Sequence, residues 1–97
     1  MDKSLYLINL YDRYSGLLTE KQRYYFENYY FNNLSLSEIS ENNKISRNAI
    51  FKQLKNIENK LKHYEEILQL YNKEKKLKKV ISNIEDEQLK KEIERII

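Results

Sequence analysis

Between residues 50 and 71 the chain places an apolar residue at every third or fourth position, and this seam constrains the fold more than any other feature. Intervals of four and three residues alternate, which keeps the side chains on one side of an α-helix. The seam consists of Ile50, Leu54, Ile57, Leu61, Tyr64, Leu68 and Tyr71. It predicts one long helix that packs lengthwise on other helices, with a second half that can project from the domain.

Composition favours an all-α fold. The 97 residues include one glycine and no proline, the two residue types that punctuate β-hairpins and long loops. Leucine, isoleucine, lysine, glutamate and glutamine, which favour helix, are abundant. A chain of this length supports one core of ordinary size, and a mean hydropathy of -0.87 indicates a large polar surface around it. We therefore expect a small helical domain.

Three shorter helices are predicted before the long one. The first ends near Gly16, which suits a left-handed helix end, and the second and third begin at capping boxes opened by Thr19 and Ser35. The first helix can turn either of two faces inward. These faces are Leu5, Ile8 and Tyr11, or Leu7, Leu10 and Tyr14.

The expected boundaries of the later elements follow from polar residues. Residues 42–44 form a turn in which asparagine tolerates positive φ, and Ser46 caps the long helix. Near the C-terminus, Ser82 and Glu85 have the spacing of a capping box for a last helix. We divide the chain into a domain of residues 1–72 and a charged helical tail of residues 73–97.

Several classes of function lack a necessary residue. The chain has no cysteine and a single histidine, His63, so thiolate metal sites are excluded and we expect no metal or cofactor. It also lacks a glycine-rich loop and a pair of carboxylates in an apolar context, so we expect no enzyme. The apolar run of residues 5–8 is too short for a signal peptide or a membrane span. We expect a cytoplasmic protein without membrane contact.

The positive charge is confined to one stretch. Residues 44–63 hold six basic side chains and one acidic side chain, whereas residues 1–43 have a net charge of −2 and residues 64–97 are neutral overall. AT-rich codons raise the lysine content of any protein, which explains the amount of lysine but not its segregation. The segregation indicates a basic surface.

Residues 34–62 have the pattern of a helix-turn-helix motif. Such a motif needs a short helix, a turn of three or four residues, and a second helix with a locked inner face and a free outer face. On a helical wheel the inner face of the second helix is apolar, and its outer face is basic and rich in amides. The motif predicts contact with double-stranded DNA.

The side chains suit different parts of a DNA duplex. Arginine, asparagine and an aromatic edge can contact base edges, whereas lysine and serine mostly contact phosphate. The candidates for base edges are Arg47, Asn48, Phe51 and Lys52. The candidates for the phosphate backbone are Ser35, Ser37, Lys44, Ser46, Lys55 and Lys62. The alternative is that the lysines form an ordinary solvated face.

Aromatic residues crowd the second predicted helix so densely that they cannot all face one way. We expect Phe26 and Tyr30 in the core. Tyr24 or Tyr25 can instead meet a second subunit or stack on an unpaired base.

Segments 18–23, 29–30, 34–39 and 45–50 resemble region 4 of bacterial sigma factors, the region that binds the −35 promoter element. They resemble the YlxM family of small helix-turn-helix proteins more closely, over about residues 5–70. The resemblance implies a gene beside that of the signal recognition particle GTPase and a part in that pathway or in its regulation. Ser40 and Lys44 stand where helix-turn-helix motifs often have alanine and glycine.

Three hypotheses follow. The first is a sequence-specific DNA-binding regulator that acts as a homodimer, because one small module binds weakly at physiological salt. The second is an accessory protein that contacts the signal recognition particle GTPase or its RNA. The third is a homodimeric adaptor, without nucleic-acid binding, whose interface is the long helix and the tail.

Overall fold

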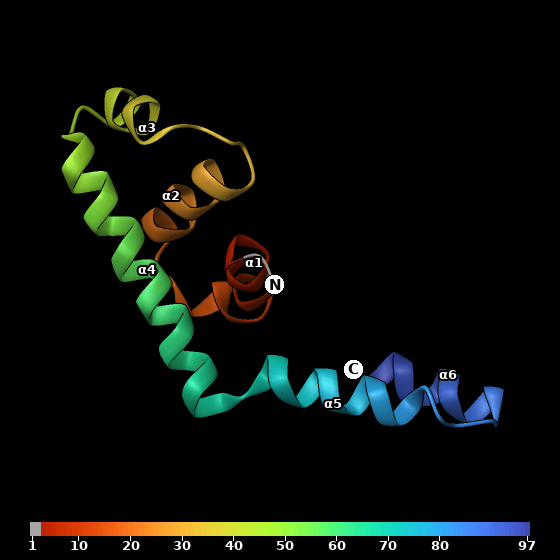
Figure 1. Cartoon of the computed structure of the whole chain (residues 1–97). Helices are drawn as coiled ribbons and strands as arrows, with labels where there is room; N and C mark the ends of the chain where they lie inside the picture. The colour runs from red at the N-terminus through yellow and green to blue at the C-terminus, as the bar shows by residue number, and fades with distance from the viewer. Residues whose placement is uncertain (1–2) are drawn as a thin grey trace.

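A computed structural model describes residues 3–97, and this part of the chain contains helices and no strand. The all-α prediction is confirmed. The elements are α1 (Lys3–Tyr14), a 3-10 turn η1 (Ser15–Leu17), α2 (Glu20–Tyr30), α3 (Leu36–Asn43), α4 (Arg47–Leu68), α5 (Leu70–Ile81) and α6 (Glu87–Ile96). We call residues 3–68 the body and residues 70–97, which hold α5 and α6, the tail hairpin. Figure 1 shows the body with the tail hairpin projecting from the end of α4.

The three predicted helix caps in the body are confirmed. Thr19 and Ser35 each accept a hydrogen bond from the backbone N–H three residues later, and the Gln22 and Glu38 side chains accept one in return. Ser46 Oγ accepts from the backbone N–H of Ala49 at 3.0 Å. Side chains thereby satisfy backbone donors that a helix start leaves without partners. The starts of α2, α3 and α4 are therefore specified locally.

The core of the body forms where α1, α2 and α3 pack against α4 (Figure 1). Phe26, expected in the core, is fully buried and stacks on Tyr11, with 4.3 Å between ring centroids. Tyr25 is also buried, whereas Tyr24 is exposed. The core consists of Leu7, Leu10, Tyr11, Tyr14, Leu18, Tyr25, Phe26, Ile39, Ile50, Leu54, Ile57 and Leu61. The second of the two faces predicted for α1 is thus the buried one, together with Tyr11 from the first.

Tyrosine hydroxyls at the edge of this core donate to glutamate carboxylates of other helices. Tyr14 donates to Glu65 and Tyr30 donates to Glu58, both at 2.6 Å. Burial of the ring and the hydrogen bond to Glu65 raise the pKa of Tyr14 to about 12. Burial of its ring and the hydrogen bond to Glu58 raise the pKa of Tyr30 as well. The glutamates allow the phenol oxygens to be buried with a partner.

The predicted left-handed positions are wrong. Gly16 lies in η1 without a positive φ, and the turn after α3 uses Lys44, at φ 54°, in place of an asparagine. Lys44 directly follows α3 as its C-cap, and its N–H donates to the carbonyls of Ser40 and Glu41. A left-handed residue at that point satisfies carbonyls that the helix end leaves free.

The prediction of one continuous helix through Tyr71 is also wrong. Gln69 adopts a left-handed conformation, at φ 57°, and separates α4 from α5. Its side chain does not cap α5. Instead, the buried carboxylate of Glu65 accepts hydrogen bonds from the backbone N–H groups of Tyr71 and Asn72, each at 3.0 Å. We call this arrangement the Glu65 clamp.

Two residues from α1 complete the junction between body and tail hairpin. Tyr14 Oη accepts from the backbone N–H of Leu70 at 3.0 Å while donating to Glu65. Arg13 Nη2 lies 2.6 Å from Glu74 Oε2, and Lys78 Nζ lies 3.0 Å from the other oxygen of Glu74. Hydrogen bonds from Lys78 and Arg13 lower the pKa of Glu74. The bend after α4 is therefore held by contacts with α1.

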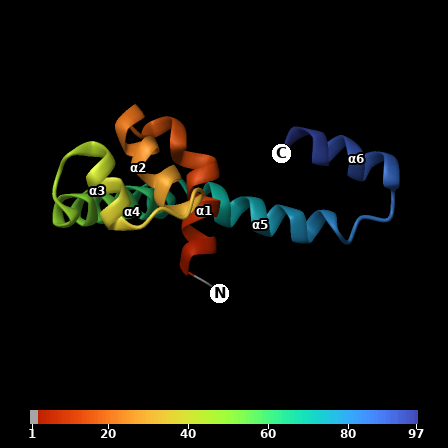
Figure 2. The ribbon, with the colours of Figure 1, turned by 90° about the horizontal axis from the view of Figure 1, so that it is seen from above.

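The tail hairpin has almost no interior. Ile81 is its one buried apolar side chain, and α6 packs on α5 alone (Figure 2). The predicted cap of the last helix is wrong: Asp86 accepts from the backbone N–H groups of Gln88 and Leu89, whereas Ser82 Oγ donates to a carbonyl within α5. Within residues 3–97, no helix has the length and apolarity that a membrane crossing requires.

Candidate nucleic-acid interface

The helix-turn-helix consists of α3, a three-residue turn and the first turns of α4. Ile39 of α3 and Ile50 of α4 are both buried where the two helices pack. Ser40, where alanine is usual, is buried and donates its hydroxyl to the Ser37 carbonyl at 2.8 Å. The backbone N–H of Ile45 donates to the Ser40 carbonyl, which closes the turn. The outer side of α4 is thereby fixed relative to α3 and left free.

All the candidate contact residues are exposed on this element. They are Ser35, Ser37, Lys44, Ser46, Arg47, Asn48, Phe51, Lys52, Lys55 and Lys62. We define the recognition face as Arg47, Asn48, Phe51, Lys52 and Lys55, which occupy the first turns of α4. Lys62 lies about 10 Å further along α4 than Lys55, given a rise of about 1.5 Å per residue. Exposure makes the set available for contact, while a role in nucleic-acid binding stays a prediction.

Three basic side chains at the start of α4 and in the turn before it are free of ion pairs. In the described part of the chain, Lys44, Arg47 and Lys52 make no ion pair. The first turn of α4 contains no acidic residue. Because a helix N-terminus also carries partial positive charge, this region suits the phosphates of a nucleic acid.

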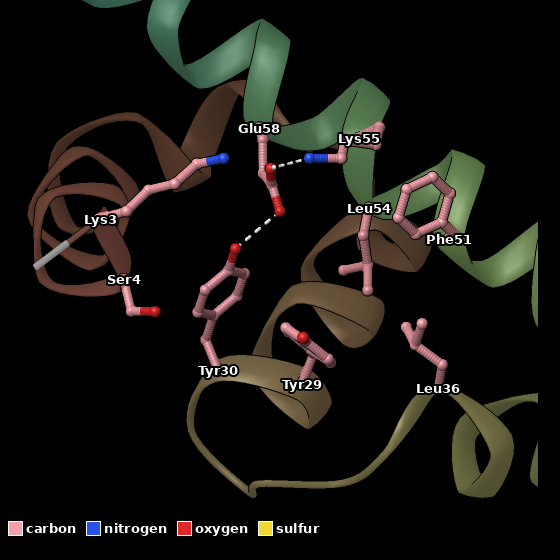
Figure 3. A pocket seen from close by; sticks show the side chains of 9 residues that line it. All are labelled: Lys3, Ser4, Tyr29, Tyr30, Leu36, Phe51, Leu54, Lys55 and Glu58. Atoms are coloured by element: carbon pink, nitrogen blue, oxygen red, sulfur yellow. Dashed lines mark hydrogen bonds and ion pairs between the residues drawn. The ribbon is translucent and has the colours of Figure 1, made fainter.

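Lys55 has a different environment from the other candidates. Its Nζ lies 3.7 Å from Glu58 Oε1 and 5.6 Å from the centroid of the Phe51 ring. Figure 3 shows Lys55 turned toward the same glutamate that accepts from Tyr30. Glu58 therefore offsets part of the charge of Lys55, whose exposed ammonium keeps donors available for a phosphate.

Beside the recognition face lies a cavity of about 260 Å³ that the sequence did not reveal (Figure 3). It is bounded by Lys3 and Ser4 of α1, by Leu36 of α3, by Tyr29 and Tyr30 of α2, and by Phe51, Leu54, Lys55 and Glu58 of α4. One side of Phe51 faces this cavity, yet 46% of the residue remains exposed. Phe51 can therefore reach a ligand in front of α4 while resting on the body.

The serines at helix starts already have structural roles. Ser35 Oγ and Ser46 Oγ each accept from a backbone N–H of the helix that they cap. A hydroxyl that accepts in a cap can still donate its hydrogen to a phosphate oxygen. Ser37 contributes its carbonyl to Ser40, which leaves its hydroxyl on the surface.

The fold and the exposed basic helix define a helix-turn-helix protein. The whole chain, residues 1–97, matches the UPF0122 family, described as "Putative helix-turn-helix protein, YlxM / p13 like". The chain belongs to this family.

Three relatives illustrate the match. A UPF0122 protein of Fusobacterium nucleatum subsp. nucleatum is 38% identical over 97 residues, covering 100% of this chain and 94% of the relative. A UPF0122 protein of Ureaplasma parvum serovar 3 is 44% identical over 95 residues, covering 98% of this chain and 96% of the relative. One of Caldanaerobacter subterraneus subsp. tengcongensis is 46% identical over 85 residues, covering 88% and 73% respectively. The similarity extends through the tail hairpin in the first two.

Proposed function

We propose that the chain is a regulatory protein that binds double-stranded DNA through the recognition face. The observation that supports this most is the free positive charge at the start of α4. Lys44 in the turn, and Arg47 and Lys52 on α4, are exposed and have no acidic partner among residues 3–97, while the opposite side of α4 is locked into the core. A helix with these properties can enter the major groove.

The residues divide by the part of DNA that they suit. Arg47 pairs with guanine, Asn48 pairs with adenine, and the edge of Phe51 contacts a thymine methyl group. Lys44, Lys52, Lys55 and Lys62 contact phosphates, with Lys52 also within reach of base edges. The hydroxyls of Ser35, Ser37 and Ser46 donate to the backbone beside the groove.

Salt dependence of binding to a random-sequence duplex tests the proposal. The variant with both Lys52→Gln and Lys55→Gln should bind at least about tenfold more weakly. Its slope of log affinity against log salt should be smaller by about 1.8, since each lost phosphate contact removes about 0.9. The matched control combines Lys79→Gln and Lys91→Gln, which remove two exposed charges from the tail hairpin. Equal losses in the two variants would refute binding through the recognition face.

We further propose that two copies act together in the cytoplasm. A single module with about five phosphate contacts binds DNA weakly at physiological salt, whereas a dimer that reaches two half-sites binds far more tightly. The proposed action is binding and regulation, without a catalytic step.

A second candidate function is binding to the signal recognition particle, through its RNA or its GTPase. Exposed aromatic rings on and just after α2 favour it, because unpaired RNA bases stack on such rings. These are Tyr24, Tyr29 and Phe31. Purification of the chain from lysate with DNase, with RNase or with neither separates the candidates. Recovery of DNA alone favours the first proposal, and recovery of one RNA that survives DNase favours the second.

A further inference from the structure

The tail hairpin presents apolar side chains that its own two helices do not cover. In α5 the stripe is Leu77, Val80 and Ile81, and in α6 it is Leu89, Ile93 and Ile96, continued by Ile97 directly after the helix. Each stripe spans about 100° of a helical wheel. Ile81 is buried, but Val80 is 62% exposed and Ile96 is 83% exposed. Short helices of this kind need packing of their apolar face for stability.

Opposite charges flank the two most exposed apolar residues. Lys76 precedes Val80 by one helical turn, and Glu92 precedes Ile96 by the same interval. Residues four apart lie about 40° from each other on the wheel, so each charge sits beside its apolar neighbour. Lys76 and Glu92 are both exposed, and neither makes an ion pair within residues 3–97.

The same opposition holds for the whole segments. α5 carries five lysines and one glutamate, a net charge of +4. Residues 85–97 carry five acidic and three basic side chains, a net charge of −2. The hairpin therefore displays a basic apolar strip beside an acidic apolar strip.

We propose that this surface binds the same surface of a second copy of the chain, forming a four-helix bundle from two tail hairpins. A two-fold axis brings one patch onto its own copy, so the patch must be complementary to itself. With α5 of one copy against α6 of the other, Lys76 faces Glu92 twice and Val80 meets Ile96 twice. A partner surface with charges of one sign only would place like charges against either the basic strip of α5 or the acidic strip of residues 85–97.

Dimerisation at this surface leaves the recognition face free. The molecule is 56 Å long and 25 Å across, and the tail hairpin extends away from the body (Figure 2). The dimer gives the proposed DNA binding its second recognition helix and so complements that function. Its existence can be tested without DNA.

A charge swap in the full-length chain tests the interface. Lys76→Glu and Glu92→Lys should each raise the dimer dissociation constant at least about tenfold, because each places like charges together twice. An equimolar mixture should restore dimers, because each variant then supplies the charge that the other lacks. Sedimentation equilibrium measures both effects, and circular dichroism verifies helix content.

Substitution of the apolar residues tests the same interface independently. Val80→Asp combined with Ile96→Asp should give monomers, whereas the control Leu17→Asp, at an exposed position of η1, should leave dimers intact. A wild-type chain that stays monomeric at high micromolar concentration would overturn the proposal. So would a mixture of the swapped variants that forms no dimer. If the chain proves to be monomeric, the proposal of DNA binding still stands or falls on the separate measurement of its salt dependence.

Discussion

The body and the tail hairpin are built from the same kind of amphipathic helix, yet they use their apolar faces differently. The body buries twelve apolar side chains among α1, α2, α3 and α4. The tail hairpin buries only Ile81 and exposes most of its other apolar residues. An apolar stripe thus indicates that one face of a helix needs to be buried. Whether other helices of the same chain bury it depends on how the chain folds around that helix.

The largest difference between the body and the tail hairpin should appear in the free energy of unfolding lost when an apolar residue is replaced by alanine. Phe26→Ala removes a fully buried ring that stacks on Tyr11, and it should lower the free energy of unfolding by about 3–5 kcal/mol. Leu89→Ala, at a half-exposed position of α6, should cost under about 1 kcal/mol when the chain is monomeric. Urea denaturation measures both. Equal costs would mean that the tail hairpin belongs to the cooperative core.

The junction between the regions should be the next most sensitive place. Glu65→Ala leaves the N–H groups of Tyr71 and Asn72 and the hydroxyl of Tyr14 without their acceptor. We expect a loss of about 3 kcal/mol and faster amide hydrogen exchange at the start of α5. Glu66→Ala, at the neighbouring exposed position, is the matched control and should have little effect. Unchanged exchange in Glu65→Ala would show that the clamp does not hold the tail.

The tyrosine at that junction should make stability depend on alkaline pH. The pKa of Tyr14 is about 12 in the folded chain and about 10 when unfolded, so only the unfolded state ionises readily between these values. Its contribution is complete below pH 10 and falls by about 2 kcal/mol as the pH rises to 12. Unfolding in urea at pH 8, 10 and 11 measures the trend. A Tyr14→Phe variant should show a shallower decline, and an identical decline would contradict the assignment.

A smaller difference in stability should appear when glycine replaces either of the two left-handed residues at the ends of α4. Lys44→Gly relieves a positive φ in the turn and should raise stability by about 0.5–1 kcal/mol. Gln69→Gly should gain less, because Gln69 Nε2 also donates to the carbonyls of Glu65 and Glu66. Thermal unfolding of the two variants measures the difference. A larger gain from Gln69→Gly would show that those side-chain bonds add nothing.

Local sequence predicted the features that depend on neighbours in the chain. The capping boxes at Thr19 and Ser35 need residues only three positions apart, and both are confirmed. The helical wheel likewise placed Asn48, Phe51 and Lys52 on an outer face, and all three are exposed.

Features that depend on distant residues were missed. The bend after α4 also depends on Tyr14, which lies 51 residues before Glu65 and bridges it to the backbone of Leu70, so periodicity alone continued the helix through Gln69. The cavity beside Phe51 requires α1 and α2 to meet α4. The contact between Lys55 and Glu58, three residues apart on α4, is by contrast a local feature that the spacing could have predicted. A charged residue inside the apolar seam, such as Glu65 between Leu61 and Leu68, was the available signal for the clamp.

The most direct test of the account is amide chemical-shift mapping of the labelled chain during titration with duplex DNA, at a concentration where its oligomeric state does not change. The account predicts the largest changes at residues 44–55, with smaller ones at residues 35–37, while residues 70–97 stay nearly constant. Changes centred on the tail hairpin or on Tyr24, Tyr29 and Phe31, with residues 44–55 unaffected, would contradict DNA binding through the recognition face.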